Sequence, residues 1–147
     1  LSSGNGMNLY RGCSHGCIYC DSRSKCYHME HSFEDIEVKR NAIPLLADTL
    51  RRKRRRCMIG MGAMTDPYIP LELELGHVRQ ALALIYEHGF GAALITKSNR
   101  LLRDIDLLEK INERCGEYGI VHNKEQIFAY LQTLDESPEA EQISLWG

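Results

Sequence analysis

The densest chemistry in the sequence is a group of three cysteines near the amino terminus. Cys13, Cys17 and Cys20 follow the spacing C-x3-C-x2-C. Thiolates are the preferred protein ligands of iron–sulfur clusters, and three of them on one loop leave the fourth iron of a cubane open to another ligand. Gly12 and Gly16 permit the tight backbone path that such a loop requires. The spacing predicts a metal site, and we expect a [4Fe–4S] cluster held by these cysteines.

Zinc is the alternative occupant of this region. Cys17 and Cys20 form a C-x2-C pair, which Cys26, His28 or His31 would complete to a four-ligand zinc site. A disulfide framework is not expected, because three of the six cysteines fall within eight residues, a grouping typical of metal binding in a cytosolic protein. The residues alone leave both metals open.

The cysteine motif and its surroundings resemble a known family. The spacing, with the aromatic Tyr19 just before the third cysteine, resembles the signature of the radical S-adenosylmethionine (radical SAM) superfamily. Longer strings are similar to its spore photoproduct lyase-like branch. They are Met7–Cys13 (MNLYRGC), Cys20–Arg23 (CDSR), Gly62–Glu72 (GAMTDPYIPLE) and Ile95–Ser98 (ITKS).

The resemblance implies a shared chemistry and a shared set of cofactors. In radical SAM proteins the open iron is chelated by S-adenosylmethionine (SAM), which one electron cleaves to methionine and a 5′-deoxyadenosyl radical. The radical then takes a hydrogen from a substrate. By resemblance we expect a [4Fe–4S] cluster and SAM, with an electron donor such as a flavodoxin or ferredoxin. The substrate and the catalytic residues are not identified.

Further residues are expected to contact SAM by the same resemblance. Tyr19 occupies the position that lies against the adenine of SAM, and its alternative role is to pack the loop onto the protein. The other positions follow two expected strands, where strand ends face the open mouth of a barrel. They are Gly62, Thr65, Asp66, Lys97 and Ser98.

The polar members of this set also have ordinary structural interpretations. Many radical SAM proteins carry Gly-Gly-Glu after the second strand, which this chain lacks, and Thr65 and Asp66 are the nearest polar substitutes. Asp66-Pro67 is equally a common turn former. Lys97 either pairs with the carboxylate of SAM or is a solvated loop lysine.

Hydrophobic spacing predicts alternating strands and helices. Strands are expected at Met7–Tyr10, Cys57–Gly62, Ala92–Thr96 and, more weakly, Gly119–Val121. Helices are expected at Asn41–Arg55, from Leu71 to His88–Gly89, at Asp104–Arg114 and from Asn123. Short connections between alternating elements predict parallel strands. The expected fold class is α/β and, by resemblance, a partial radical SAM-type βα barrel with a mainly parallel sheet.

The chain is short for a complete barrel. It forms one expected domain over residues 1–147, whereas an eight-unit barrel takes about 250 residues. The resemblance covers residues 5–112 and resumes at 118–146, so we expect an internal deletion near 114–115. Residues 135–147 are expected to form a loose acidic tail. We expect a chain without half of its cavity to bind cluster and SAM weakly and not to turn over a large substrate.

Charge is unevenly distributed along the chain. Arg51–Arg56 is an unbroken run of six cations, although the net charge is −2. At the end of a helix such a run is usually a solvated face, and its functional interpretation is a patch that binds the phosphates of nucleic acid. A DNA-acting lyase of the spore photoproduct lyase type is therefore a second hypothesis. A non-catalytic metal-binding or interaction module is the third.

The remaining features bound the setting of the protein. No apolar run approaches the roughly 18 residues of a membrane span, and residues 1–6 lack the charge and apolar pattern of a signal peptide. We therefore expect no membrane partner and a cytoplasmic protein. Cys26 is expected to be a loop thiol, and its alternative role is a substrate-side thiol near the cluster.

Overall fold

A parallel sheet of three short strands organises the protein. The computed structural model describes residues 1–2 and 4–135, so nearly all of the predicted acidic tail lies outside the described residues. The strands are β1 (Gly6–Met7), β4 (Met58–Met61) and β5 (Gly91–Leu94), in the order β1-β4-β5. Both pairings are parallel, which confirms the α/β class and the predicted strand direction.

The register of the sheet brings its strand ends level. Met61 of β4 pairs with Met7 of β1 on one side and with Leu94 of β5 on the other. All three strands therefore finish at one edge, and the three segments that follow them emerge side by side. Ligand sites of open α/β sheets lie at this carboxyl edge.

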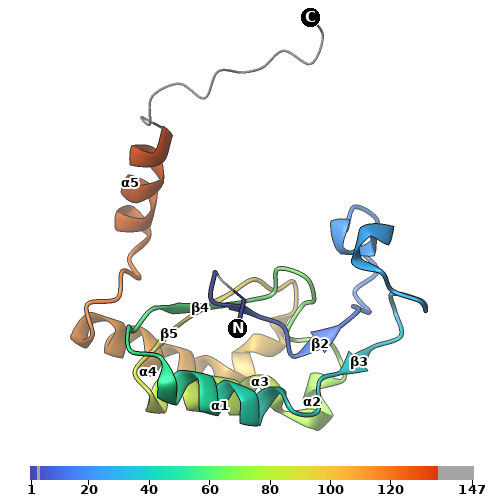
Figure 1. The fold of residues 1–147 in the computed structure, drawn as a ribbon, viewed down its shortest axis with the longest axis horizontal. Coiled ribbons are helices and arrows are strands. Elements are labelled where there is room, and N and C mark those ends of the chain that lie inside the picture. The colour runs from blue at the N-terminus through green and yellow to red at the C-terminus, as the bar shows by residue number, and fades with distance from the viewer. Residues whose placement is uncertain (3, 136–147) are drawn as a thin grey trace, which may run out of the picture.

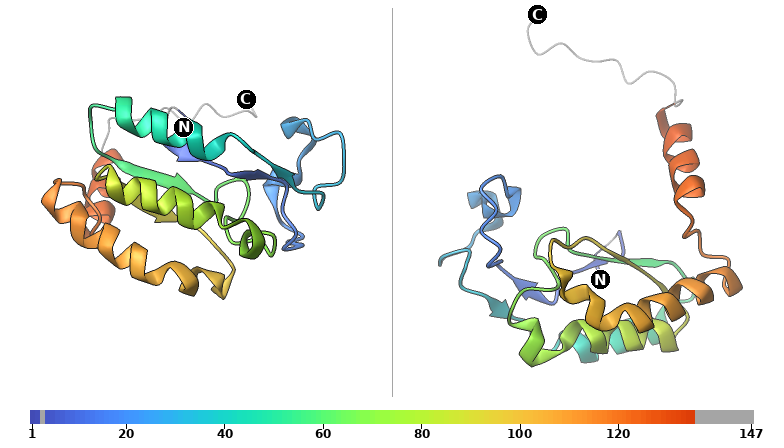
Figure 2. Two further views of the ribbon diagram at one scale, coloured as in Figure 1. Left: turned by 90° about the horizontal axis from the view of Figure 1, so that it is seen from below. Right: turned by 180° about the vertical axis from the view of Figure 1, so that it is seen from behind.

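Three helices cover one face of the sheet. They are α1 (Ala42–Arg52), α3 (His77–Glu87) and α4 (Ile105–Glu117), and they lie side by side in Figures 1 and 2. The core forms because Val78, Leu82 and Ile85 recur at steps of four and three on α3, and all three are fully buried. No helix covers the opposite face within the part of the chain that the structure describes (Figure 1).

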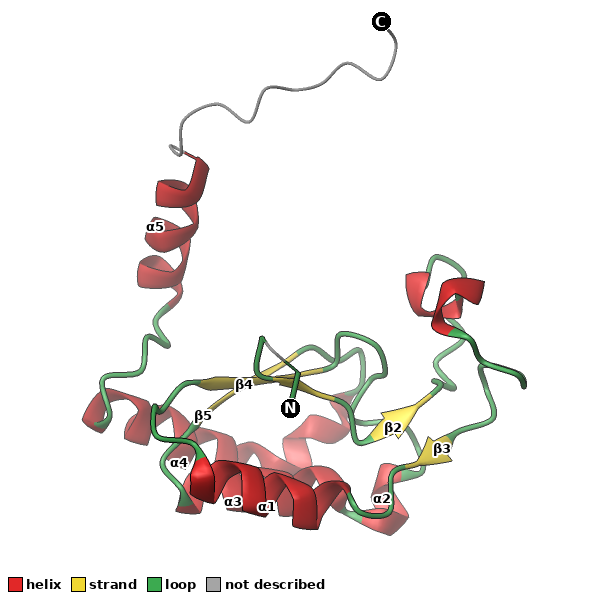
Figure 3. Ribbon diagram, in the orientation of Figure 1, coloured by secondary structure: helices red, strands yellow, loops and turns green. Residues whose placement is uncertain are grey.

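Shorter elements lie around this core (Figure 3). They are β2 (Tyr10–Arg11) and β3 (Glu37–Val38), which pair antiparallel, α2 (Glu72–Leu75), and the 3₁₀ turns η1 (Asp21–Arg23), η2 (Lys25–Tyr27) and η3 (Asn99–Asp104). The last helix, α5 (Lys124–Asp135), stands away from the sheet in Figure 1. Its predicted cap is present, since Glu125 N donates to Asn123 Oδ1 at 2.8 Å.

Several predicted elements are divided or shortened. The expected strand at Met7–Tyr10 is split between β1 and β2. The expected helix from Leu71 is broken into α2 and α3 at Gly76, whose φ of 62° lies in the left-handed region. The expected helix at Asn41–Arg55 ends at Arg52, because the chain must turn back toward β4. Most of the basic run therefore follows the helix.

The region after residue 114 differs from the prediction more strongly. Helix α4 runs unbroken through Cys115 to Glu117, across the point where a deletion was expected. The predicted strand at Gly119–Val121 is wrong, because Gly119 (φ 62°) and Ile120 cap α4 instead. Ile120 N donates to Cys115 O at 2.9 Å, which satisfies a carbonyl at the helix end.

Among the residues that the structure describes, every helix is too short or too polar to cross a membrane. This agrees with the expected absence of a membrane-spanning segment as far as those residues go.

Truncating the α3 stripe tests this account of the core. Leu82 is fully buried, so Leu82→Ala should lower the free energy of unfolding by about 2–5 kcal/mol through lost burial and a residual cavity. Urea unfolding followed by circular dichroism measures the change. A loss below about 1 kcal/mol would mean that α3 does not pack on the sheet as described.

Candidate functional site

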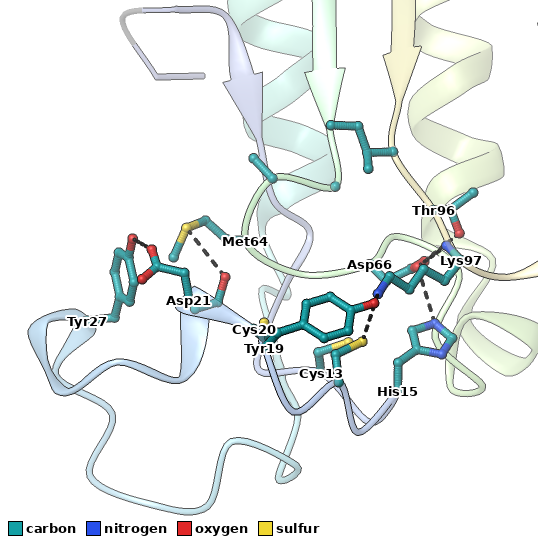
Figure 4. Close-up of a pocket in the computed structure, with 15 residues that line it drawn as sticks. Cys13, His15, Tyr19, Cys20, Asp21, Tyr27, Met64, Asp66, Thr96 and Lys97 are labelled. Carbon is teal, nitrogen blue, oxygen red and sulfur yellow. Dashed lines mark hydrogen bonds and ion pairs between the residues drawn. The ribbon is translucent and has the colours of Figure 1, made fainter.

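A pocket lies at the edge of the sheet where the three parallel strands end. Its volume is about 300 Å³, and all three motif cysteines, Cys13, Cys17 and Cys20, line it (Figure 4). Cys13 is buried, the other two are half-buried, and none forms a disulfide. The structure thus brings the predicted ligands around one hollow, which is called the cysteine pocket below. The segments that follow β4 and β5 form its other walls.

Backbone contacts hold the cysteine loop, residues 12–20, in place. Cys13 N donates to Phe33 O at 2.8 Å. A β-carbon at Gly12 would lie 2.6 Å from the same oxygen, and Gly12 has a φ of 87°, so only glycine fits there. Arg23 Nε donates to Cys17 O at 3.1 Å, and the guanidinium lies over the ring of Phe33. The loop is therefore tied to the segment before β3 at both ends.

Asp66 joins three segments around the pocket. Its Oδ1 accepts from Tyr68 N at 2.8 Å and from Thr96 Oγ1 at 2.7 Å, and its Oδ2 accepts from Lys97 N at 2.7 Å. His15 Nε2 lies 3.3 Å from Oδ2, without the angle of a hydrogen bond. Both carboxylate oxygens are thus engaged by the protein. The turn interpretation of Asp66 is confirmed, and the carboxylate also clamps neighbouring loops.

Lys97 and Tyr19 meet at the mouth of the pocket. Lys97 Nζ lies 3.3 Å from Cys17 Sγ, donates to the Tyr19 hydroxyl and stands 4.2 Å from the ring centroid. The hydrogen bond to Tyr19, followed by the one to Cys17, raises the pKa of Lys97. Tyr19 remains 77% exposed, so its ring is available to a ligand on one side.

The floor of the pocket is apolar and depends on one glycine. Gly62 has a φ of 104°, and a β-carbon there would lie 2.0 Å from Ile95 O. The segments after β4 and β5 therefore touch only because residue 62 has no side chain. Ala63, Met64 and Ile95 complete this floor.

Two predicted residues do not reach the pocket. Thr65 is buried, and it is absent from the pocket lining. Ser98 is also buried, and its Oγ accepts from Arg100 N at 3.3 Å, which caps η3. Their predicted place in a SAM-binding surface is wrong for this arrangement, because each side chain is turned into the protein.

Other lining residues were not predicted. His15, Thr96 and Met64 face the pocket in Figure 4. The place of His15 inside the C-x3-C spacing could have marked it, because a residue between two ligands of a tight loop lies close to both. Thr96 and Met64 gave no signal beyond their position after expected strands.

The grouping of ligand side chains separates two kinds of metal site. Among residues 1–2 and 4–135, no three His, Cys, Asp or Glu side chains are grouped so that they could hold one metal ion. The zinc set that adds Cys26, His28 or His31 to the C-x2-C pair is therefore not assembled. A cubane is held differently, because each thiolate binds its own iron and the sulfurs surround a cube.

The basic run lies at the opposite end of the sheet. Lys53, Arg55 and Arg56 line a hollow of about 440 Å³ together with Met58, the first residue of β4. Arg56 is stacked over Phe90, 5.1 Å from the ring centroid. The cysteine pocket lies beyond the other end of the same strand, so the run does not contribute to it.

The comparisons with known proteins find relatives but no named family. A scan against models of protein families finds no match, and no solved structure gives a significant match. An uncharacterized protein of Methanocaldococcus jannaschii is 32% identical over 108 residues, which cover 72% of this chain and 40% of the relative. Uncharacterized proteins of Mycobacterium tuberculosis and Mycobacterium bovis are 32% identical over 108 residues, covering 69% of this chain and 32% of each relative.

The chain therefore spans two fifths or less of the length of these relatives. Their printed names assign no activity.

The close approach at Gly62 can be tested directly. Gly62→Ala should destabilise the protein by at least about 2 kcal/mol, because the new methyl group requires a left-handed backbone and displaces Ile95 O. Gly60→Ala is the matched control, since a β-carbon at Gly60 meets no atom within 4 Å. Urea unfolding compares the two. Equal effects of the two substitutions would contradict the contact.

The clamp at Asp66 gives a second expectation. Asp66→Asn replaces one acceptor oxygen by an amide donor, so at least one of the donors from Tyr68, Thr96 and Lys97 loses its partner. We expect a loss of about 1–3 kcal/mol in unfolding free energy. Asp35→Asn, at an exposed position, is the control. Unchanged stability of the Asp66 variant would show that the clamp does not hold in solution.

Proposed function

We propose that this chain is a radical SAM protein of the spore photoproduct lyase-like branch, which binds a [4Fe–4S] cluster and SAM in the cysteine pocket. One observation carries the proposal. Cys13, Cys17 and Cys20 have the predicted spacing and line a single pocket at the carboxyl ends of parallel strands. That edge is where α/β folds of this kind place their ligands.

The residues of the pocket fit a cubane. All three sulfurs are free thiols, and thiolates are the donors that iron–sulfur clusters take. Gly12 and Gly16, with φ of 87° and 69°, provide the sharp backbone turns within the cysteine loop. The donor set therefore supports three thiolate ligands on one cluster, with one iron left for SAM.

The chain's own groups are suited to hold SAM beside the thiols. A cluster bound here supplies the single electron that cleaves SAM to methionine and a 5′-deoxyadenosyl radical. The apolar floor of Ala63, Met64 and Ile95 keeps water from one side of the pocket. The exposed face of Tyr19 offers a surface for the adenine ring. Lys97 carries a positive charge at the mouth, where it attracts the SAM carboxylate.

The fold supports a partial βα barrel of the radical SAM type. The three-stranded parallel sheet with helices on one face supplies the beginning of such a barrel. The chain spans two fifths or less of its matched relatives, which supports a missing second half. With the far wall absent, we propose weak SAM binding and no turnover of a large substrate. The electron donor is a flavodoxin or a ferredoxin.

Reconstitution without oxygen tests the proposal. Wild-type protein supplied with iron and sulfide should become brown and retain about four iron atoms per chain. Cys17→Ala should lose the colour, whereas Cys26→Ala, at an exposed cysteine outside the pocket lining, should keep it. Visible absorbance and iron analysis measure both. A colourless wild type that holds one zinc would overturn the cluster assignment.

The reaction itself is tested with dithionite as the electron source. The reconstituted protein should release 5′-deoxyadenosine from SAM slowly, and Cys17→Ala should release none. Chromatography of the products gives the rate. A stable cluster without any SAM cleavage would instead favour a non-catalytic metal-binding module.

A further inference from the structure

An ion cluster is buried beneath the two loops that line the cysteine pocket. The ion cluster consists of Glu72, Arg103 and Asp104, and both carboxylates are fully buried. Arg103 Nη2 lies 2.8 Å from Glu72 Oε1 and 2.8 Å from Asp104 Oδ2. Arg79 adds a contact of 2.9 Å to Asp104 Oδ1. Two anions are thus held by the guanidinium of Arg103 between them.

The ionised form of this cluster is maintained at neutral pH. Burial acts to raise the pKa of Asp104, but hydrogen bonds from Arg103 and Arg79 outweigh it and hold that pKa below its ordinary value. Glu72 is satisfied as well, because Val78 N at the start of α3 donates to Oε1 at 3.0 Å. The cluster is therefore a fixed point between α2, α3 and η3.

One tyrosine connects this fixed point to the cysteine loop. The buried hydroxyl of Tyr10 donates to Glu72 Oε2. Burial, followed by the hydrogen bond to Glu72, raises the pKa of Tyr10, so the hydroxyl keeps its proton. Tyr10 lies in β2, three residues before Cys13. The start of the cysteine loop is thereby anchored to Glu72.

A second tyrosine connects the same point to the Asp66 loop, residues 62–68. Tyr68 is fully buried, and its hydroxyl donates to Asp104 Oδ2 at 3.1 Å. Its backbone N donates to Asp66 Oδ1, the carboxylate that clamps the pocket. The two loops that face each other across the pocket are therefore both tied to Arg103, one through each carboxylate.

Stability alone does not account for such a cluster. Removing charges from water costs several kcal/mol per ion, and well-packed apolar residues of the same volume commonly stabilise a protein as well or better. A buried ion cluster contributes instead through the geometry that its directed hydrogen bonds impose. Here those bonds end on the two loops of the cysteine pocket and on the first turn of α3.

We propose that the ion cluster sets the spacing between the cysteine loop and the Asp66 loop, with Tyr10 and Tyr68 as the positioning residues that transmit it. The inference rests on the proposed function only in treating the pocket between these loops as a cofactor site. The spacing itself is a property of the metal-free protein and is measurable there.

Hydrogen exchange of the metal-free protein tests the spacing. In Tyr10→Phe, Tyr68→Phe and Arg103→Lys, the backbone amides of residues 12–20 should exchange about fivefold faster, as expected when one hydrogen bond is lost. Arg103→Lys keeps the charge but loses the fork that reaches both carboxylates. Unchanged exchange in residues 12–20 of all three variants would overturn the proposal.

Two controls separate positioning from general loss of stability. Tyr118→Phe removes a hydroxyl at a side chain that is 46% exposed and should change nothing. Leu82→Ala destabilises the core away from the ion cluster, so it should lower the urea midpoint without selectively speeding the exchange of residues 12–20. Selective acceleration of that loop in Leu82→Ala, equal to that in Tyr10→Phe, would mean that the ion cluster is only structural.

The loaded protein supplies an independent readout. SAM should change the electron paramagnetic resonance spectrum of the reduced cluster in the wild type and in Leu82→Ala. The change should be reduced at least about fivefold in Tyr10→Phe and Tyr68→Phe at the same SAM concentration. An unaltered response in both tyrosine variants would count against the proposal. A wild type that takes up no cluster overturns the proposed function alone, because the exchange measurement needs no metal.

Discussion

The parallel pairing of β4 with both of its neighbours is the constraint on which the rest of the structure depends. Because Met7, Met61 and Leu94 stand opposite one another, the segments after β1, β4 and β5 leave the sheet at one level. Residues far apart in the sequence are thereby placed around one hollow. The pairing of β4 needs no side chain beyond Gly60, but the loops after it meet only because Gly62 lacks a β-carbon.

The second constraint is that the sheet is covered on one side only. Helices α1, α3 and α4 bury one face, whereas Ile95 at the end of β5 is 69% exposed. Parallel sheets are normally covered on both faces, because their strands are apolar on both. The matched relatives are more than twice as long as this chain, and additional strands in them would have this face and the free edge of β5 to build upon. This is the physical content of the proposed partial barrel.

Features with a local cause were predictable from the sequence. Three cysteines within eight residues must lie close together whatever the fold, and the stripe of Val78, Leu82 and Ile85 has one buried solution on a helix. The break at Gly76 was missed because the apolar spacing continues across it. The cap at Gly119 was misread as a strand, although a glycine after a helix is an established end signal.

The roles of Asp66 and Ser98 show where such reasoning stops. Both were placed at strand ends correctly, but the partners of Asp66 include Thr96 and Lys97, which lie far along the chain. Contacts of that kind depend on the sheet register, which no local pattern encodes. Ser98 was recoverable, because a serine two residues before the backbone N–H that it accepts is a common local cap.

What the pocket leaves unsatisfied defines its chemistry. Asp66 has both oxygens engaged by the protein, and Lys97 is already directed at Cys17 and Tyr19. The apolar floor offers contact area but no hydrogen bonds. The groups with the most unused bonding capacity are therefore the three thiols, since sulfur makes only weak hydrogen bonds and forms strong bonds to metals. A pocket built in this way discriminates between ligands through sulfur coordination first, and its polar rim then selects what can approach the coordinated metal.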